Sequence, residues 1–119
     1  MKLEVDTKND LINFKKMSIF HNGNNSRYLY DAIKNGFDVN IKNDIGDTIF
    51  HDGYHSGHLI FAIENGFNIN LQNNKGDTVF HNNYHSKYLR LAIDHGFNIE
   101  LENDNGQTVL HHLEKPKIF

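Results

Sequence analysis

The sequence contains no cysteine and only one proline among its 119 residues. The lack of cysteine excludes disulfides, thiolate metal sites and a cysteine nucleophile. Hydrophobic residues make up 38% of the chain, below the roughly 45–50% of an average globular protein. Such a composition supplies a single round core thinly. It favours an elongated arrangement in which each unit buries only the faces that it shares with its neighbours.

Signals for export, membrane insertion and nucleic-acid binding are also missing. The formal net charge is −3, and no run of Lys or Arg forms a basic stripe of the kind that binds phosphates. The first residues, MKLEVDTKNDLINF, carry acids where an export signal needs an apolar run. No stretch approaches the roughly 20 apolar residues of a membrane span. We therefore expect a cytoplasmic protein that binds neither nucleic acid nor membrane.

Catalytic motifs are absent too. Neither the phosphate-binding pattern GxxxxGK[ST] nor the nucleophile pattern GxSxG occurs. The acids are spread along the chain. Asp47 and Asp77 precede expected helix starts, where a helix dipole favours negative charge. We expect no enzyme activity and no cofactor.

What the chain does contain is a repeat of 30 residues. Residues 46–75 and 76–105 align without a gap and are identical at 17 of 30 positions. Residues 16–45 follow the same register, and residues 106–119 begin a fourth copy. A gap-free period over most of a chain is typical of repeat architectures. The predicted organisation is an N-terminal cap at 1–15, three repeats, and a partial repeat with a C-terminal cap.

Each copy predicts the same local elements. Helices of about ten residues are expected at 26–35, 56–65 and 86–95, because each begins with Ser, has apolar residues at helical spacing and ends at a glycine. A shorter helix is expected to begin near Thr48, Thr78 and Thr108. Between them, Asn- and Asp-rich segments predict short hairpin-like loops.

These patterns resemble the ankyrin repeat family. The resemblance lies in residues 46–51 (GDTIFH), 76–81 (GDTVFH) and 106–111 (GQTVLH), and in residues 35–40 (NGFDVN) and 65–70 (NGFNIN). It implies an all-α repeat protein, an α-solenoid in which helix-turn-helix units with short hairpin loops form a stack. The period is 30 rather than about 33 residues. The missing residues fall between the longer helix and the six-residue motif at 46–51, 76–81 and 106–111, which we call the box. The first helix should therefore be about one turn short.

The nine histidines raise the question of a metal site. His21, His51, His81 and His111 fall at the box position, where the resemblance implies bonds to the nearby Thr hydroxyl and to the backbone of the adjoining loop. We expect His55 and His85 to be structural residues at the junction between the helices. No HExxH or similar spacing occurs, so we predict no metal ligand, although a histidine-based metal protein or enzyme stays an alternative.

Positions that vary between the copies are candidates for partner recognition. In ankyrin-like arrays, the residues after the box histidine and the loop tips line the face where partners dock. Tyr is also enriched at interface hot spots, which makes Tyr54 and Tyr84 candidates. These two side chains could equally fill the space left by the short first helix. The predicted partner-binding residues are Asn22, Asp52, Tyr54, Asn82, Asn83, Tyr84, His112, Asn43, Asp44, Asn73, Asn74, Asn103 and Asp104.

The ends of a repeat array must hide an apolar face. Leu11, Ile12 and Phe14 are expected to cover the first copy. Pro116 should end any helix, after which Ile118 and Phe119 either fold back as a lid or form a dimer contact. We expect a monomer rather than an oligomer.

The sequence thus predicts a non-enzymatic module that binds and occludes another protein. The acidic and amide-bearing loop tips predict a partner surface that is basic or rich in hydrogen-bond donors. One version is an immunity protein that neutralises a cognate toxin; another is a host-directed effector or viral ankyrin adaptor.

Overall fold

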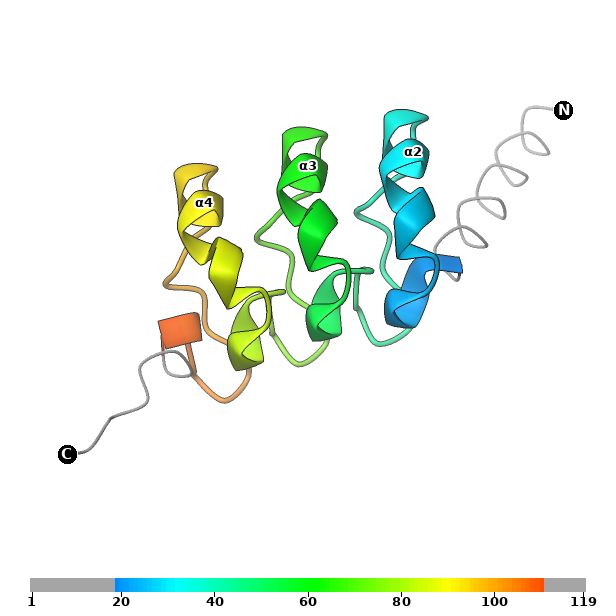
Figure 1. Cartoon of the computed structure of the whole chain (residues 1–119). Coiled ribbons are helices and arrows are strands. Elements are labelled where there is room, and N and C mark those ends of the chain that lie inside the picture. The colour runs from blue at the N-terminus through cyan, green and yellow to red at the C-terminus, as the bar shows by residue number, and fades with distance from the viewer. Residues whose placement is uncertain (1–18, 111–119) are drawn as a thin grey trace, which may run out of the picture.

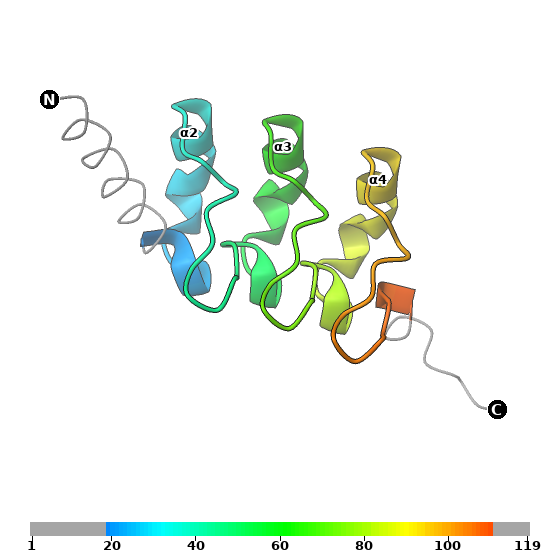
Figure 2. The same ribbon diagram turned by 180° about the vertical axis from the view of Figure 1, so that it is seen from behind.

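The computed structural model describes residues 19–110, and this part of the chain is helical, without a strand. Three α-helices lie wholly within it, α2 (Leu29–Lys34), α3 (Leu59–Glu64) and α4 (Leu89–Asp94), and they lie side by side in both views of the ribbon (Figures 1 and 2). The residues at its two edges, 19–20 and 109–110, are helical as well. The predicted cap residues Leu11, Ile12 and Phe14, the recognition residue His112, and the segment Pro116–Phe119 lie outside the described residues.

Each α-helix is entered through a 3-10 turn, so that every unit has one continuous helical run. The turns are η2 (Ser26–Tyr28), η4 (Ser56–His58) and η6 (Ser86–Tyr88). The helical runs therefore cover residues 26–34, 56–64 and 86–94, which confirms the predicted long helices. Gly36, with φ of 98°, ends the first run. The N–H of Phe37 then reaches back to the carbonyl of Ala32 at 2.9 Å, as in a left-handed helix C-terminus.

The second predicted helix is reduced to a single 3-10 turn in each unit: η1 (His21–Gly23), η3 (His51–Gly53) and η5 (His81–Asn83). The hydroxyl of Thr48 accepts the N–H of Phe50 at 3.2 Å and closes a local turn before η3. The helix cannot continue, because Asp52 and Gly53 both have positive φ. The prediction that this helix is shortened is confirmed, but the shortening is larger than expected. A 3-10 turn of three residues remains in place of a short α-helix.

The predicted role of serine as a helix cap was wrong. No side chain caps η2, η4 or η6, and the residue before each serine has left-handed backbone angles. The hydroxyls of Ser26 and Ser56 instead bond to the following unit, as described below. Because the left-handed residue precedes the serine, the serine is the first residue of the 3-10 turn. Its hydroxyl is then available for a neighbouring unit instead of the N-terminus of its own helix.

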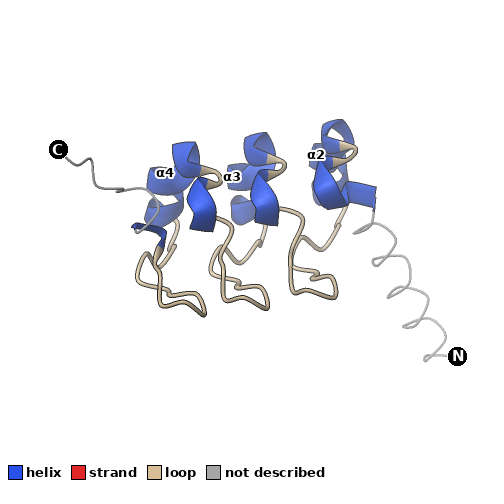
Figure 3. Ribbon diagram, turned by 90° about the horizontal axis from the view of Figure 1, so that it is seen from below, coloured by secondary structure: helices blue, strands red, loops and turns tan. Residues whose placement is uncertain are grey.

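The apolar core lies within and between the units. Paired phenyl rings recur in every unit, with centroids 5.2 Å apart for Phe20 and Phe37 and 4.9 Å apart for Phe50 and Phe67. Ala62 and Ala92 are fully buried, and their small side chains let neighbouring helices approach closely. The loops project together from one side of the row of helices (Figure 3). No helix among the described residues has the length and apolarity needed to cross a lipid bilayer.

Close contact between units also depends on glycine. Gly53 has φ of 86°, and a Cβ atom added there would lie 2.7 Å from Cδ1 of Tyr84 in the next unit. Gly23 is related to Tyr54 in the same way, with a distance of 2.5 Å. A glycine in one unit thus makes room for a tyrosine of the next.

We expect Gly53→Ala to lower the free energy of unfolding by about 1–3 kcal/mol, because the alanine is strained at positive φ and collides with Tyr84. Gly57→Ala is the matched control, since a Cβ atom there meets nothing within 4 Å. It should leave the stability unchanged or raise it by less than about 1 kcal/mol. Urea unfolding followed by circular dichroism measures both, and equal effects would contradict the close contact.

Candidate protein-binding surface

The box histidines join the loop of one unit to the next. Nδ1 of His51 accepts the backbone N–H of Thr48 at 2.9 Å and lies 3.0 Å from its hydroxyl, while Nε2 lies 3.0 Å from the carbonyl oxygen of Asp77. His81 repeats these bonds with Thr78 and the carbonyl of Gln107. A nitrogen that accepts an N–H carries no proton, so His51 and His81 are neutral with the proton on Nε2. Their expected structural role is confirmed.

His21 differs from the other two box histidines. Its Nε2 lies 3.0 Å from the amide nitrogen of Asn43, and its buried Nδ1 has no partner among residues 19–110. The equivalent of Thr48 in this copy is Ser18, which lies outside the described residues, as does His111.

His55 and His85 form a second set of bridges between units. Nε2 of His55 donates to the carbonyl of Phe20 at 2.7 Å, and its Nδ1 lies 2.5 Å from the hydroxyl of Ser26. His85 makes the same two bonds with Phe50 (2.7 Å) and Ser56 (2.6 Å). Both histidines are buried, and burial lowers the pKa of each below its ordinary value near 6.5. Their expected role at a junction is confirmed, but the junction joins successive units.

The same two imidazole rings alternate with phenyl rings. His55 is edge-on to Phe20 and Phe50, with both centroids 6.2 Å away. His85 lies similarly between Phe50 at 6.4 Å and Phe80 at 6.3 Å. A column of five aromatic rings therefore runs through the three units. It combines apolar contact with the polar bonds that position each histidine.

The Ser–His pairs have the separation of a nucleophile and its general base. Both ring nitrogens of His55 and His85 are, however, used to join units, and the rings are only 7% and 6% exposed. A lowered pKa also makes each imidazole a weaker base. The geometry therefore assigns these pairs to structure. Among residues 19–110, no three His, Cys, Asp or Glu side chains converge on a point that could hold a metal ion.

Three predicted recognition residues, Asn43, Asn73 and Asn103, use their side chains inside the protein. The Oδ1 atom of Asn73 accepts the N–H groups of Lys75 and Asp77, and its amide donates to Oδ1 of Asp47 at 2.8 Å. Asn43 and Asn103 accept the equivalent pairs of N–H groups. These asparagines hold the loop turns together, which explains why all three copies have the same residue there.

The next residue in each loop faces solvent. Asp44, Asn74 and Asp104 are exposed. Asn74 contacts the preceding unit through its backbone N–H, which donates to the carbonyl of Ile45, and through its amide, which donates to the carbonyl of Asp44. The carboxylates of Asp44 and Asp104 remain available at the loop tips.

Asn22, Asp52 and Asn82 are exposed, and the backbone accounts for their residue types. Their φ angles are 59°, 70° and 67°, and Asn83 also has a positive φ of 68°. Asn and Asp tolerate left-handed angles better than other residues with a side chain. The limited variation that suggested recognition is therefore set in part by conformation, although the side chains do face solvent.

Tyr54 and Tyr84 combine the two roles considered for them. Each ring packs against a glycine of the preceding unit, and the residues are still 40% and 38% exposed. Asn24 replaces this tyrosine in the first unit.

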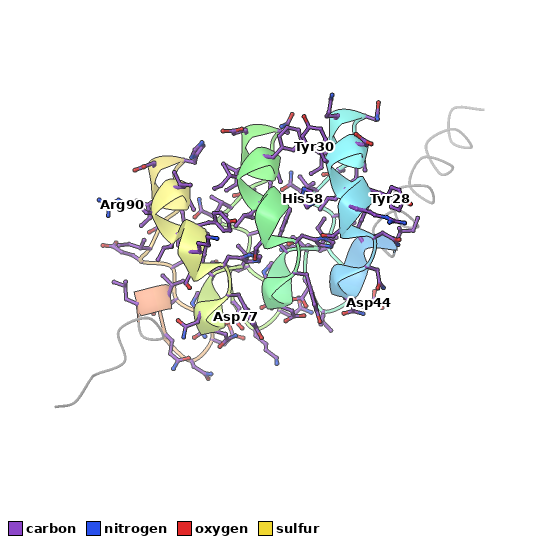
Figure 4. The ribbon with its side chains drawn as sticks, in the orientation of Figure 1. Tyr28, Tyr30, Asp44, His58, Asp77 and Arg90 are labelled. Carbon is purple, nitrogen blue, oxygen red and sulfur yellow. The ribbon has the colours of Figure 1, made fainter. Side chains whose placement is uncertain are left out.

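The electrostatic character of the loop side is strongly acidic. Outside the runs 26–35, 56–65 and 86–95, the described residues include eight Asp or Glu and two Lys, a net charge of −6. The runs themselves have four cations and three acids. Within residues 19–110, the one ion pair joins His95 and Glu64 at 3.8 Å and lies on the helices. Figure 4 places Asp44 and Asp77 at the loop end and Tyr30 and Arg90 along the helices.

Asp52 illustrates the crowding of these carboxylates. Partial burial, and then the neighbouring carboxylate of Asp47, raise the pKa of Asp52 above its ordinary value near 3.8. His51 and His21 act in the opposite direction, but the net shift is upward. The position therefore favours a neutral residue, and the other two units have Asn there.

The sequence analysis missed a further set of bonds between loops. The amide of Asn40 donates to the carbonyl of Gly66 at 2.9 Å, and its Oδ1 accepts the N–H of Asn68 at 2.7 Å. Asn70 bonds Gly96 and Asn98 in the same way. The signal was present, because the third unit has Glu100 at this position. An asparagine is needed only where another complete unit follows.

We expect Ser56→Ala to lower the free energy of unfolding by about 1–2 kcal/mol, because Nδ1 of buried His85 loses its partner. Ser86→Ala is the control at the same repeat position. Ser86 is exposed, and Lys115 stands where the next histidine would be, so the change should stay within about 0.5 kcal/mol. Urea denaturation measures both variants. Similar losses in the free energy of unfolding would contradict the Ser56–His85 bridge.

Acid should destabilise the folded protein below pH 6.5. Burial is the main cause that lowers the pKa of His51, His55 and His85, so the unfolded chain takes up protons near pH 6.5 while the folded chain resists them. Stability is then complete above this pH and is lost as the pH falls towards the folded-state values. We expect a loss of about 1–3 kcal/mol between pH 7.5 and 5.5.

Urea unfolding at the two pH values measures this loss. His85→Asn, which keeps a residue that tolerates left-handed angles, should show a smaller difference between them. A stability that does not change with pH would contradict the assignment of neutral buried histidines.

No protein-family model matches the sequence, and a search of the curated proteins finds no match. What the protein does must therefore be inferred from its own residues and their geometry.

Proposed function

We propose that the chain is a short α-solenoid, an ankyrin-like stack of three units with a partial fourth. The proposal is supported by bonds that recur between successive units. His51 reaches Asp77 as His81 reaches Gln107, and Asn40 reaches Gly66 as Asn70 reaches Gly96. Identical contacts repeated at a constant offset are what a quasi-one-dimensional array requires.

The function that this arrangement supports best is non-enzymatic binding of a partner protein with a basic surface, through the loop side. The observation that carries this proposal is the uneven charge, with a net −6 on the described residues outside the three helical runs and nearly balanced charge within them. Within the described residues, no cation forms an ion pair with the carboxylate of Asp44 or Asp104. A Lys or Arg of the partner would be their first ion-pair partner. Electrostatic complementarity of this kind speeds association and selects the partner.

Asp52 adds a second argument. Its carboxylate lies beside Asp47 at a position where the fold accepts Asn equally well. A charge that is unfavourable in the free protein becomes favourable when a cation of the partner approaches it. Tyr54, exposed on the same connecting segment, would supply apolar contact next to that charge. A module of this kind acts by covering its partner's surface, and an immunity protein and an adaptor both fit this proposal.

Binding through the loop side should be lost when its charges are removed. We expect Asp44→Asn with Asp52→Asn to weaken capture of the partner at least tenfold, because two solvent-facing carboxylates disappear. The same pair should raise or preserve thermal stability, by less than about 1 kcal/mol, because exposed charges contribute little to folding. Asn at position 52 also keeps the left-handed angle that Ala would strain.

The matched control removes two acids from the helices, Asp31→Asn with Glu64→Gln. The immobilised protein and the two double variants are exposed to lysate of the source cells at 0.1 and 0.5 M salt, and bound proteins are quantified by mass spectrometry. A basic protein retained by the wild type and the control, but lost with the loop variant or high salt, supports the proposal. Equal capture by both variants, or capture that does not respond to salt, rules it out.

A further inference from the structure

The last helix of the array presents an apolar face that the earlier helices cover. Leu29 and Leu59 are fully buried, whereas their counterpart Leu89 is partly exposed. One turn later in each helix, the exposed fraction of the isoleucine rises from 6% for Ile33 in α2 to 42% for Ile93 in α4. In α2 both residues are buried, and in α3 Leu59 is buried while Ile63 is partly buried. After α4, only Val109 and Leu110 are helical within the described residues.

This face is a groove with charged edges. Ser86, Leu89, Arg90, Ile93 and Asp94 line an open pocket of about 500 Å³ on α4. Arg90 and Asp94 are four residues apart, so they lie on one side of the helix together with the two apolar residues. Neither of them forms an ion pair within residues 19–110.

The charges distinguish α4 from its two counterparts. The position of Arg90 is occupied by Tyr30 in α2, where the ring packs on Phe61 of the next unit with centroids 4.5 Å apart. In α3 the residue is Ile60. The position of Arg90 thus has an aromatic or aliphatic residue in the first two units and a cation in the third. One turn later every unit has a charge (Lys34, Glu64 and Asp94), and only α4 combines a cation with an acid at these two positions.

We propose that the α4 face binds the α4 face of a second copy of this chain, with the two helices antiparallel about a two-fold axis. A two-fold contact uses the same patch on both partners, so the patch must complement itself. In this arrangement Arg90 of each copy faces Asp94 of the other, and Leu89 and Ile93 of the two copies pack between the charges. The face lies on the helices and not on the acidic loops, so dimerisation does not depend on the function proposed above.

A second copy fits this face better than an unrelated partner does. An apolar patch alone would accept many partners, but a cation and an anion one turn apart match their own reversed copy. The sequence analysis expected a monomer. The exposure of Leu89 and Ile93 becomes evident only when the units are placed in space. The other possible occupant is the segment Ile118–Phe119 of the same chain, and the experiment separates the two.

Sedimentation velocity of the full chain, from micromolar to millimolar concentration, tests the proposal with reciprocal charge reversals. We expect the wild type to form a dimer that dissociates on dilution. Arg90→Asp or Asp94→Arg alone should weaken the dimer at least tenfold, because each places like charges opposite one another. The double variant with both changes should regain wild-type affinity, since its patch is again self-complementary. Lys34→Asp, at the equivalent position of Asp94 in α2, is the control and should dimerise normally.

Thermal unfolding of every variant verifies that loss of the dimer is not loss of the fold. A wild type that stays monomeric throughout the range overturns the proposal. If Ile118→Asp then lowers the stability of that monomer, the face belongs to the chain's own C-terminal segment. Assembly that grows beyond the dimer, or a double variant no better than the single ones, rules out the two-fold arrangement.

Discussion

The structure depends on buried histidines that bond across the boundary between units. His55 and His85 each donate to a carbonyl of the preceding unit while their rings lie between phenyl groups. A chain with 38% hydrophobic residues has too little apolar surface to join its units by packing alone. Polar bonds shielded from water add directional contacts at each boundary, and they require the imidazoles to be neutral. Stability, register and sensitivity to acid therefore have the same origin.

The first and third described units depart from the repeat at positions that bond or pack between units elsewhere. Asn24 and Asn25 stand where later units have the Tyr–His pair that contacts the preceding unit, and Glu100 stands where earlier units have the asparagine that contacts the following one. Asn83 replaces the glycine that makes room for a tyrosine. Exceptions to the repeat thus follow from the geometry of the contacts. The exposed face of α4 is the one boundary where apolar residues remain without such a change, which is why it suggests a further contact.

Charge is unevenly divided between the three helical runs and the segments that connect them. The loops need Asn and Asp for their turns, and several of these carboxylates, such as that of Asp47, are partly occupied by neighbouring amides. The turns do not need the carboxylates of Asp44, Asp52 and Asp104, and these three side chains leave the loop side acidic. The helices keep a nearly even balance of charge, so long-range attraction of a basic protein would be directed to the loops. The two proposed contacts, with a basic partner and with a second copy, use different surfaces, so a substitution in one leaves the other unchanged.

The sequence by itself determined the period and the three helical runs, because these depend on local patterns repeated every 30 residues. The resemblance to ankyrin repeats implied the structural role of the box histidines, which His51 and His81 show. It also indicated that the first helix would be short. The sequence could not determine that Ser26 and Ser56 bond to the next unit rather than cap a helix, since a cap and a bridge have the same local signature. Nor could it show that Asn73 and Asn103 are used internally while Asp44 and Asp104 face solvent. Those distinctions, and the exposure of Leu89 and Ile93, depend on which atoms of different units meet, and only the tertiary structure decides that.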